Sequence, residues 1–213
     1  MKQIIIHPYG PPGCGKGRVA SATIALLKKI IPDGNIAYIS MGDLIRAEIK
    51  AGTPLGKQIE HLVNSGGLVD DQTINKIAAK ALNGPEQVKL IDGFPRTQEQ
   101  FDFLKTILNK EETIFFTLFR DTPVEIILER VELRRVCEDC NSTHSKLDGS
   151  CPYCGGRSLV RPDDANIHKR LQEFKEKTLP LWDRMTELGS TQRFTTEEAD
   201  EIASTVVKLL FEE

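Results

Sequence analysis

The sequence predicts an α/β fold in three layers, with a parallel five-stranded sheet between helices. Two observations predict it: short apolar runs alternate with helix-like segments along most of the chain, and a glycine-rich loop joins the first run to the first helix. Because parallel strands are connected by crossovers that are usually helices, this alternation favours a sheet covered on both faces. Residues 41–69 and 135–161 do not follow the alternation and predict insertions.

The strands and helices are expected in alternating order. Strands are expected at 4–6, 35–39, 87–91, 113–119 and 192–195, where apolar or β-branched residues lie between turn signals. Helices are expected at 19–30, in an Ala- and Ile-rich segment ending at 83–85, and at 98–108, 123–133, 165–188 and 197–211. Thr195 and Glu198 form a capping box that opens the last helix. The first insertion holds two short helices separated by Gly52-Thr53-Pro54.

Composition limits the class of protein. The chain has 213 residues, of which 39% are hydrophobic and 28% charged, so it can bury the core of one folded domain. It has 28 Lys and Arg against 31 Asp and Glu, a net charge of −3, which opposes a generic nucleic-acid-binding surface. The aliphatic runs are too short for a membrane helix, and the N-terminus does not resemble a signal peptide. We therefore expect a cytoplasmic protein without a membrane partner.

Four of the five cysteines form two pairs: Cys137-x2-Cys140 and Cys151-x2-Cys154. In a reducing compartment this spacing indicates a metal site, and four thiolates make a closed, structural zinc site without a position for a catalytic water. The alternatives are four free thiols or two disulfides. The fifth cysteine, Cys14, is most simply a small residue that fills a tight loop.

A phosphate-binding loop follows the first strand. In Gly10-x4-Gly15-Lys16 the backbone N–H groups and the lysine can hold the phosphates of a nucleotide when the loop lies between a strand and a helix. The alternative is a glycine turn with a chance lysine. Gly17 occupies the position at which most such loops carry the Ser or Thr that holds magnesium.

Four motifs together resemble the adenylate kinase family: 10–17 (GPPGCGKG), 40–46 (SMGDLIR), 92–97 (DGFPRT) with Gln100, and 161–164 (RPDD). The resemblance covers nearly the whole chain and implies a three-layer P-loop kinase fold. It divides the chain into a core (1–39, 70–133 and 162–213), an AMP-binding insertion (40–69) and a lid (134–161), which carries zinc in some members. The activity it implies is Mg·ATP + AMP ⇌ 2 ADP, in a monomer that binds ATP, AMP and ADP and no nucleic acid.

The same resemblance implies the role of each site residue. The catalytic residues are Lys16, Arg96, Arg134, Arg161 and Arg170. ATP would contact Gly13, Cys14, Gly15, Lys16, Gly17, Arg18, Arg130 and Arg134. AMP would contact Met41, Arg46, Val69, Gly93, Arg96, Gln100, Arg161 and Arg170. Asp92 would bind the water shell of magnesium, and Asp163 and Asp164 either tie the lid to the donor or cap the following helix.

Departures from the family pattern leave alternatives open. Arg18 replaces a common Thr near the donor's α-phosphate, and Met41 replaces a Thr beside the acceptor base. Gln100 favours adenine, because an amide donates and accepts at once. The rival hypotheses are a monophosphate kinase with another acceptor base, which Met41 favours, and a zinc-ribbon nucleic-acid-binding module.

Overall fold

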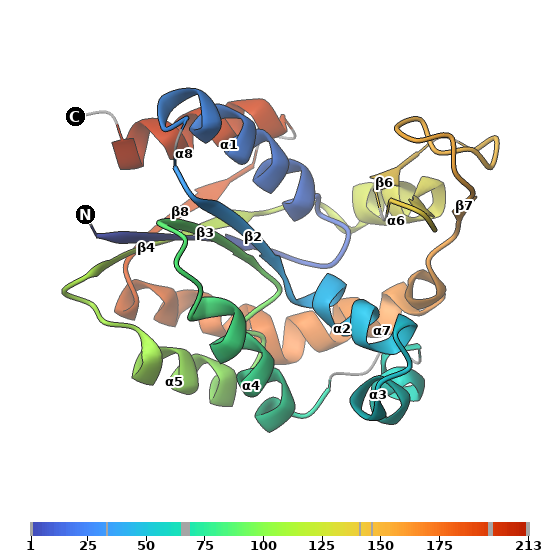
Figure 1. The fold of residues 1–213 in the computed structure, drawn as a ribbon, viewed down its shortest axis with the longest axis horizontal. Helices are drawn as coiled ribbons and strands as arrows, with labels where there is room; N and C mark the ends of the chain where they lie inside the picture. The colour runs from blue at the N-terminus through green and yellow to red at the C-terminus, as the bar shows by residue number, and fades with distance from the viewer. Residues whose placement is uncertain are drawn as a thin grey trace.

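A parallel five-stranded sheet lies at the centre of the molecule (Figure 1). The computed structural model describes residues 2–32, 34–64, 69–140, 142–145, 147–195 and 198–211. The strands are β1 (Gln3–Tyr9), β2 (Ile36–Ser40), β3 (Val88–Asp92), β4 (Thr113–Arg120) and β8 (Ser190–Phe194). They run in the order β2-β3-β1-β4-β8, and neighbours pair in parallel, which confirms the predicted sheet.

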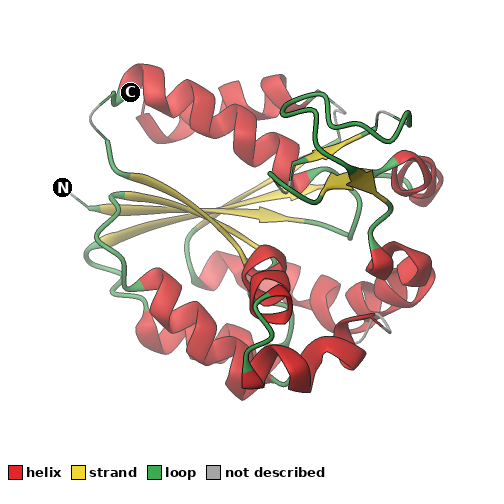
Figure 2. Cartoon of the chain, turned by 45° about the vertical axis from the view of Figure 1, so that its right-hand side comes forward, coloured by secondary structure: helices red, strands yellow, loops and turns green. Residues whose placement is uncertain are grey.

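Helices cover both faces of this sheet, as Figure 2 shows from a second side. Side chains of β1 alternate between the faces, so Ile4 and Ile6 pack on α1 (Lys16–Ile30) and α8 (Ala199–Phe211). Ile5 packs in the opposite cluster with α4 (Asp71–Leu82) and α5 (Gln98–Ile107). Because both faces are buried, an uninterrupted apolar strand is stable at the centre of the sheet.

The first insertion consists of two short helices, as predicted. These are α2 (Met41–Lys50) and α3 (Pro54–Asn64), separated at Gly52, whose φ of 61° suits glycine. The Thr53 hydroxyl accepts a hydrogen bond from the Gly56 N–H at 2.9 Å and so satisfies one donor at the start of α3. Residues 65–68 of the predicted insertion lie outside the described part of the chain.

The second insertion contains a small antiparallel sheet that the sequence did not predict. It follows α6 (Val124–Leu133) and comprises β5 (Arg135–Cys137), β6 (Thr143–His144) and β7 (Ser158–Leu159), in the order β6-β5-β7. Strands of two or three residues are too short to show a period of two in the sequence.

The sequence predicted one continuous α-helix over 165–188, and this prediction was wrong about the kind of helix. The chain is helical there, but it changes from 3₁₀ in η1 (Pro162–Asn166) to α in α7 (Ile167–Glu173), π in η2 (Phe174–Thr178) and 3₁₀ in η3 (Leu179–Glu187). Pro180 has no N–H to donate and therefore interrupts the α-helical hydrogen-bond pattern.

The described part of the last helix begins at Ala199. Residues 196–197 lie outside the described chain, so the capping box stays a prediction. None of the helices in the described ranges has the length and apolar character that a membrane crossing requires.

Candidate active site

The glycine-rich loop lies between β1 and α1, where the sequence placed it. Gly15 has a φ of 95°, and a Cβ added there would lie 2.3 Å from the Arg120 guanidinium, so both conformation and space require glycine. Lys16 folds back over the loop, with Nζ donating to the carbonyl oxygens of Gly10 and Pro11, each at 2.8 Å. The N–H groups at the start of α1 and the lysine are therefore held together at one point, as an anion site requires.

A cleft of about 1440 Å³ opens over this loop. It is bounded by the loop, by α2 and α3 of the first insertion, by α4 and by the second insertion. The predicted nucleotide-site residues that line it are Gly13, Gly15, Lys16, Gly17, Arg18, Met41, Arg46, Val69, Asp92, Gly93, Arg96, Gln100, Arg130, Arg134, Arg161 and Arg170. Folding thus brings residues from distant parts of the sequence to one cleft.

The side chain of Cys14 points elsewhere. It is fully buried and packs with Ile127, Val131 and Ile167 in a small apolar cluster, while its carbonyl oxygen accepts a hydrogen bond from the Arg130 guanidinium at 3.2 Å. This is the placement of a small residue that fills a tight loop. A contact from Cys14 to a nucleotide would therefore come from its backbone.

Asp92 ends β3, the strand next to β1. Parallel strands bring their carboxyl ends to the same edge of a sheet, so this carboxylate lies near the glycine-rich loop. The Tyr38 hydroxyl donates to Oδ2 of Asp92 at 2.9 Å and also lies 3.5 Å from the place of a Cβ on Gly17. Burial and the Asp92 carboxylate raise the pKa of Tyr38, so the phenol remains a hydrogen-bond donor.

Arg96 and Arg46 lie on the side of the cleft formed by the first insertion. Arg96 follows the cis peptide Phe94-Pro95, and its Nε donates to the Gly93 carbonyl at 2.9 Å. Burial lowers the pKa of Arg96, and Asp92 opposes this effect. Arg46, on α2, forms an ion pair with Asp43 at 2.5 Å. Each guanidinium group thus has a partner in the protein that holds it in place.

Three arginines surround two aspartates at the base of the second insertion. Arg161 binds Asp163 through Nε at 3.1 Å and through a second nitrogen at 2.7 Å. Arg170 lies 2.9 Å from Asp163 and 3.4 Å from Asp164, and Arg134 binds both carboxylate oxygens of Asp164. Neither aspartate caps a helix, because Arg161 and Asn166 hold the capping positions of η1 and α7, so that hypothesis was wrong.

Electrostatics in this cluster favour the charged forms. Burial acts to raise the pKa of Asp163, but Arg161 and Arg170 outweigh it and lower that pKa to about 2. Burial lowers the pKa of Arg170 to about 10, with Asp163 opposing the change, so this arginine stays a cation at neutral pH. The two carboxylates therefore offset two of the three arginine charges, which lowers the cost of burying the arginines.

Arg120 was missed by the sequence analysis. It ends β4, is 1% exposed, and donates to the Gly15 carbonyl at 3.3 Å. A sequence signal existed, because a basic residue there closes an otherwise apolar strand. Arg18, by contrast, is an exposed residue on the first turn of α1 and lines the cleft.

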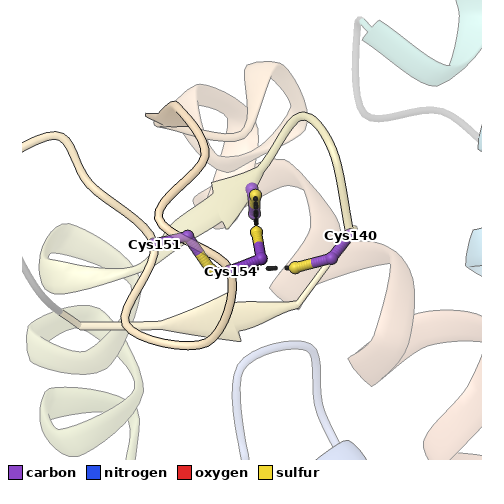
Figure 3. A group of neighbouring side chains, drawn as sticks. Cys140, Cys151 and Cys154 are labelled. Atoms are coloured by element: carbon purple, nitrogen blue, oxygen red, sulfur yellow. Dashed lines mark hydrogen bonds between the residues drawn. The ribbon is translucent and has the colours of Figure 1, made fainter.

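The four cysteines of the second insertion converge on one point, and Figure 3 shows the sulfur atoms of Cys140, Cys151 and Cys154 turned toward one another. The four sulfurs lie within 4.8 Å of one another, with Cys137 and Cys154 at 3.5 Å and Cys140 and Cys151 at 3.7 Å. Tetrahedral zinc with bonds of about 2.3 Å separates its sulfurs by about 3.8 Å. The spacing fits zinc and is too long for disulfides, whose sulfurs lie about 2.05 Å apart.

Hydrogen bonds act in opposite directions on two of these thiols. They favour the thiolate at Cys151, whereas at Cys154 the Gly156 N–H favours it but the thiols of Cys140 and Cys137 outweigh this and raise the pKa to about 12. The low exposure of Cys151 acts to raise its pKa, but the Ser142 hydroxyl and the N–H groups of Tyr153 and Cys154 lower it to about 6. Nε2 of His144 forms a hydrogen bond with the Ser158 hydroxyl at 2.8 Å, and His144 is not part of the four-sulfur group. The chemistry of this donor set is therefore that of a tetrathiolate.

Comparison with known proteins identifies the family. The family model described as adenylate kinase matches residues 9–190. An adenylate kinase of Clostridium tetani is 38% identical over 184 residues, which are 81% of this chain and 82% of the relative. That of Treponema denticola is 36% identical (83% and 84%), and that of Kosmotoga olearia is 35% identical (85% and 86%). These matches leave the zinc-ribbon module without support, and the chain belongs to the adenylate kinase family.

Proposed function

We propose that the chain transfers the terminal phosphoryl group of Mg·ATP to AMP, reversibly, giving two ADP. The observation that carries this proposal is the convergence of Lys16 and seven arginines on one cleft of a net-acidic protein. Phosphoryl transfer spreads negative charge over oxygen atoms in the transition state, and fixed cations stabilise that charge. The cleft also exceeds the roughly 300–1,000 Å³ of a pocket for one small ligand, which suits two nucleotides.

The donor nucleotide would bind at the glycine-rich loop. Its phosphates would accept from the backbone N–H groups of 13–17 and from Lys16, in place of the two carbonyl oxygens that Lys16 now contacts. Charge-assisted bonds to phosphate are stronger than bonds to neutral carbonyls, so this exchange favours binding. Arg130 would stack on the donor adenine, and Arg18 would lie near the α-phosphate.

The acceptor would bind on the side of the first insertion. Arg46 and Arg96 would hold its phosphate through planar guanidinium groups, which match phosphate oxygens in pairs. Gln100 would contact the base beside Met41 and Val69, and Gly93 leaves space for Arg96, because a Cβ there would lie 2.7 Å from its guanidinium.

Arg134, Arg161 and Arg170 would close over the transferred group. Their ion pairs with Asp163 and Asp164 hold them near the cleft in the absence of nucleotide. The acceptor phosphate is already ionised at neutral pH, so the transfer needs no general base and passes in line without a covalent intermediate. Closure of the lid would exclude water and suppress hydrolysis of ATP.

Members of the adenylate kinase family use magnesium with ATP, and Asp92 fits this ion. It is a carboxylate at the edge of the sheet beside the phosphate loop, and Tyr38 fixes its orientation. Oxygen ligands suit magnesium, which keeps much of its water shell. When bound, magnesium neutralises phosphate charge, and Asp92 would hold its waters.

The four cysteines would bind one structural zinc ion. Four thiolates fill the tetrahedral coordination, so the metal would stabilise the lid without taking part in the chemistry. We further propose the division into core, insertion (40–69) and lid (134–161), because residues of all three parts line one cleft. We also propose a monomer in the cytoplasm, a reducing compartment that suits cysteines without disulfides.

An acceptor panel tests the proposal. Initial rates with ATP and each of AMP, UMP, CMP and GMP should give the highest kcat/KM for AMP. A better pyrimidine acceptor would transfer the assignment to another monophosphate kinase, as the replacement of Thr by Met41 allows.

A further inference from the structure

The Gln100 side chain is held by two partners of opposite character. Its Oε1 accepts from the Arg96 backbone N–H at 2.7 Å, and its Nε2 donates to Oδ1 of Asp71 at 2.7 Å. Its own backbone is fixed in the first turn of α5, where the N–H donates to the Thr97 hydroxyl at 3.2 Å. The residue is 2% exposed, so its side chain has little freedom to rearrange.

These partners allow one orientation of the amide. A backbone N–H can only donate and a carboxylate can only accept, so Oε1 must face Arg96 and Nε2 must face Asp71. If the amide rotated by half a turn, Nε2 would face the Arg96 N–H, donor against donor, and Oε1 would face the Asp71 carboxylate, acceptor against acceptor. An amide oxygen accepts two hydrogen bonds and an amide nitrogen donates two, so each group has capacity for one further bond on the base.

Five apolar residues lie on the same side of the cleft as Gln100, and the arginines there, Arg46 and Arg96, are assigned to the acceptor phosphate. Met41, Ile45, Val63, Val69 and Ile74 line the same side of the cleft and pack into the core beneath it. Such side chains place a base but do not distinguish hydrogen-bond donors from acceptors on its edge. Among the described residues, Gln100 lines the cleft and Asp71 does not, so Asp71 acts from behind Gln100.

We propose that Asp71 is a positioning residue that sets base selectivity by fixing the amide of Gln100, an inference that rests on the proposed AMP acceptor site. Adenine presents an amino donor beside a ring-nitrogen acceptor, which the fixed amide matches. Hypoxanthine, of nearly the same shape, presents a carbonyl acceptor beside a ring N–H donor. It requires the reversed amide, which the Asp71 carboxylate opposes.

The experiment compares AMP and IMP as acceptors in Asp71→Asn and Asp70→Asn. Asn at 71 has the same shape and can donate or accept, so the reversed amide is then opposed only at the Arg96 N–H and costs less than beside the Asp71 carboxylate. Asp70→Asn removes the same charge one residue away, at the N-cap of α4, where Asn caps as well as Asp. The ratio of kcat/KM for AMP to that for IMP should fall about tenfold in Asp71→Asn, as expected for loss of one charge-assisted hydrogen bond. It should stay within about twofold of the unmodified protein in Asp70→Asn.

Combining Asp71→Asn with Gln100→Ala tests whether Asp71 acts on base selectivity through the Gln100 amide. There, Asp71→Asn should change the ratio no further, since the amide that it orients is gone. An unchanged ratio in folded Asp71→Asn, with AMP transfer intact, would overturn the role of Asp71 and leave the proposed function standing. Equal use of IMP and AMP by the unmodified protein would overturn the acceptor assignment and this inference with it. Thermal unfolding confirms that each variant is folded.

Discussion

Replacing Asp163 with Asn tests whether the arginine cluster depends on a buried carboxylate. The Asp163 side chain is 11% exposed and contacts Arg161 at 2.7 Å and Arg170 at 2.9 Å. Asn has the same shape and keeps one acceptor oxygen, but it lacks the charge. The expected result is a less stable protein at neutral pH and a weaker dependence of its stability on acid.

The size of the effect follows from the pKa. A fall from 3.8 to about 2 on folding corresponds to roughly 2.5 kcal/mol of stability at neutral pH. Because the pKa is lower in the folded state, this stability is fully present above about pH 4 and is lost as the pH falls through about 2. For a chain of this length the loss in Asp163→Asn should lower Tm by roughly 5–10 °C.

The assay is urea unfolding of both proteins between pH 7 and pH 2.5. The difference in unfolding free energy should be constant near neutral pH and shrink below pH 4. Asp102→Asn is the matched control, since it removes a charge from an exposed pair with Arg184 at 3.3 Å and should change stability by less than about 1 kcal/mol. Equal stability of Asp163→Asn and the unmodified protein at pH 7 would refute the argument.

The remaining predictions concern the nucleotide and metal sites. Lys16→Ala should lower the rate of phosphoryl transfer by several orders of magnitude in steady-state assays because it removes a cation from the transition state, whereas Lys28→Ala, at the exposed end of the same helix, should not. Arg18→Thr should change KM for ATP more than KM for AMP, and equal changes would place Arg18 away from the donor. Tyr38→Phe removes the hydrogen bond to Asp92, the carboxylate proposed to hold magnesium, so more magnesium should be needed for half-maximal binding of ATP, measured by calorimetry without an acceptor. Cys151→Ser should lower zinc content by elemental analysis and expose the lid first to proteolysis, and full zinc occupancy in this variant would contradict the tetrathiolate site.

The sheet could be predicted because its strands are short and apolar and its first connection is a phosphate loop. The C-terminal end of β1 could not be predicted from the sequence. His7, Pro8 and Tyr9 do not resemble a strand, yet β1 continues through them. Its pairing with β3 ends at Ile6, so Pro8, which has no N–H, lies where only β4 remains as a partner.

The chemistry of these residues also depends on the fold. Burial, with Lys16 nearby, lowers the pKa of His7 to about 3, so His7 is neutral inside the sheet. The Tyr9 hydroxyl donates to the Thr178 carbonyl, 169 residues away. No local pattern in the sequence predicts such contacts.

The candidate site also combines residues that the sequence predicts with contacts that only the fold reveals. Motifs of fixed spacing predicted the loop, three of the arginines (Arg46, Arg96 and Arg161) and the cysteines. The partners that hold them come from elsewhere: Asp71 lies 29 residues before Gln100, and Arg120 lies 105 residues after Gly15. Charge balance between arginines and aspartates, and the orientation of one amide, are properties of the folded chain.

The most direct test of the central claim is the product of the reaction itself. With ATP, AMP and magnesium, ³¹P NMR should show two ADP formed for each AMP consumed, no inorganic phosphate, and approach to the same equilibrium from ADP alone. Two results would contradict phosphoryl transfer to AMP: AMP that is not consumed, or ATP that is hydrolysed to ADP and inorganic phosphate when no AMP is present.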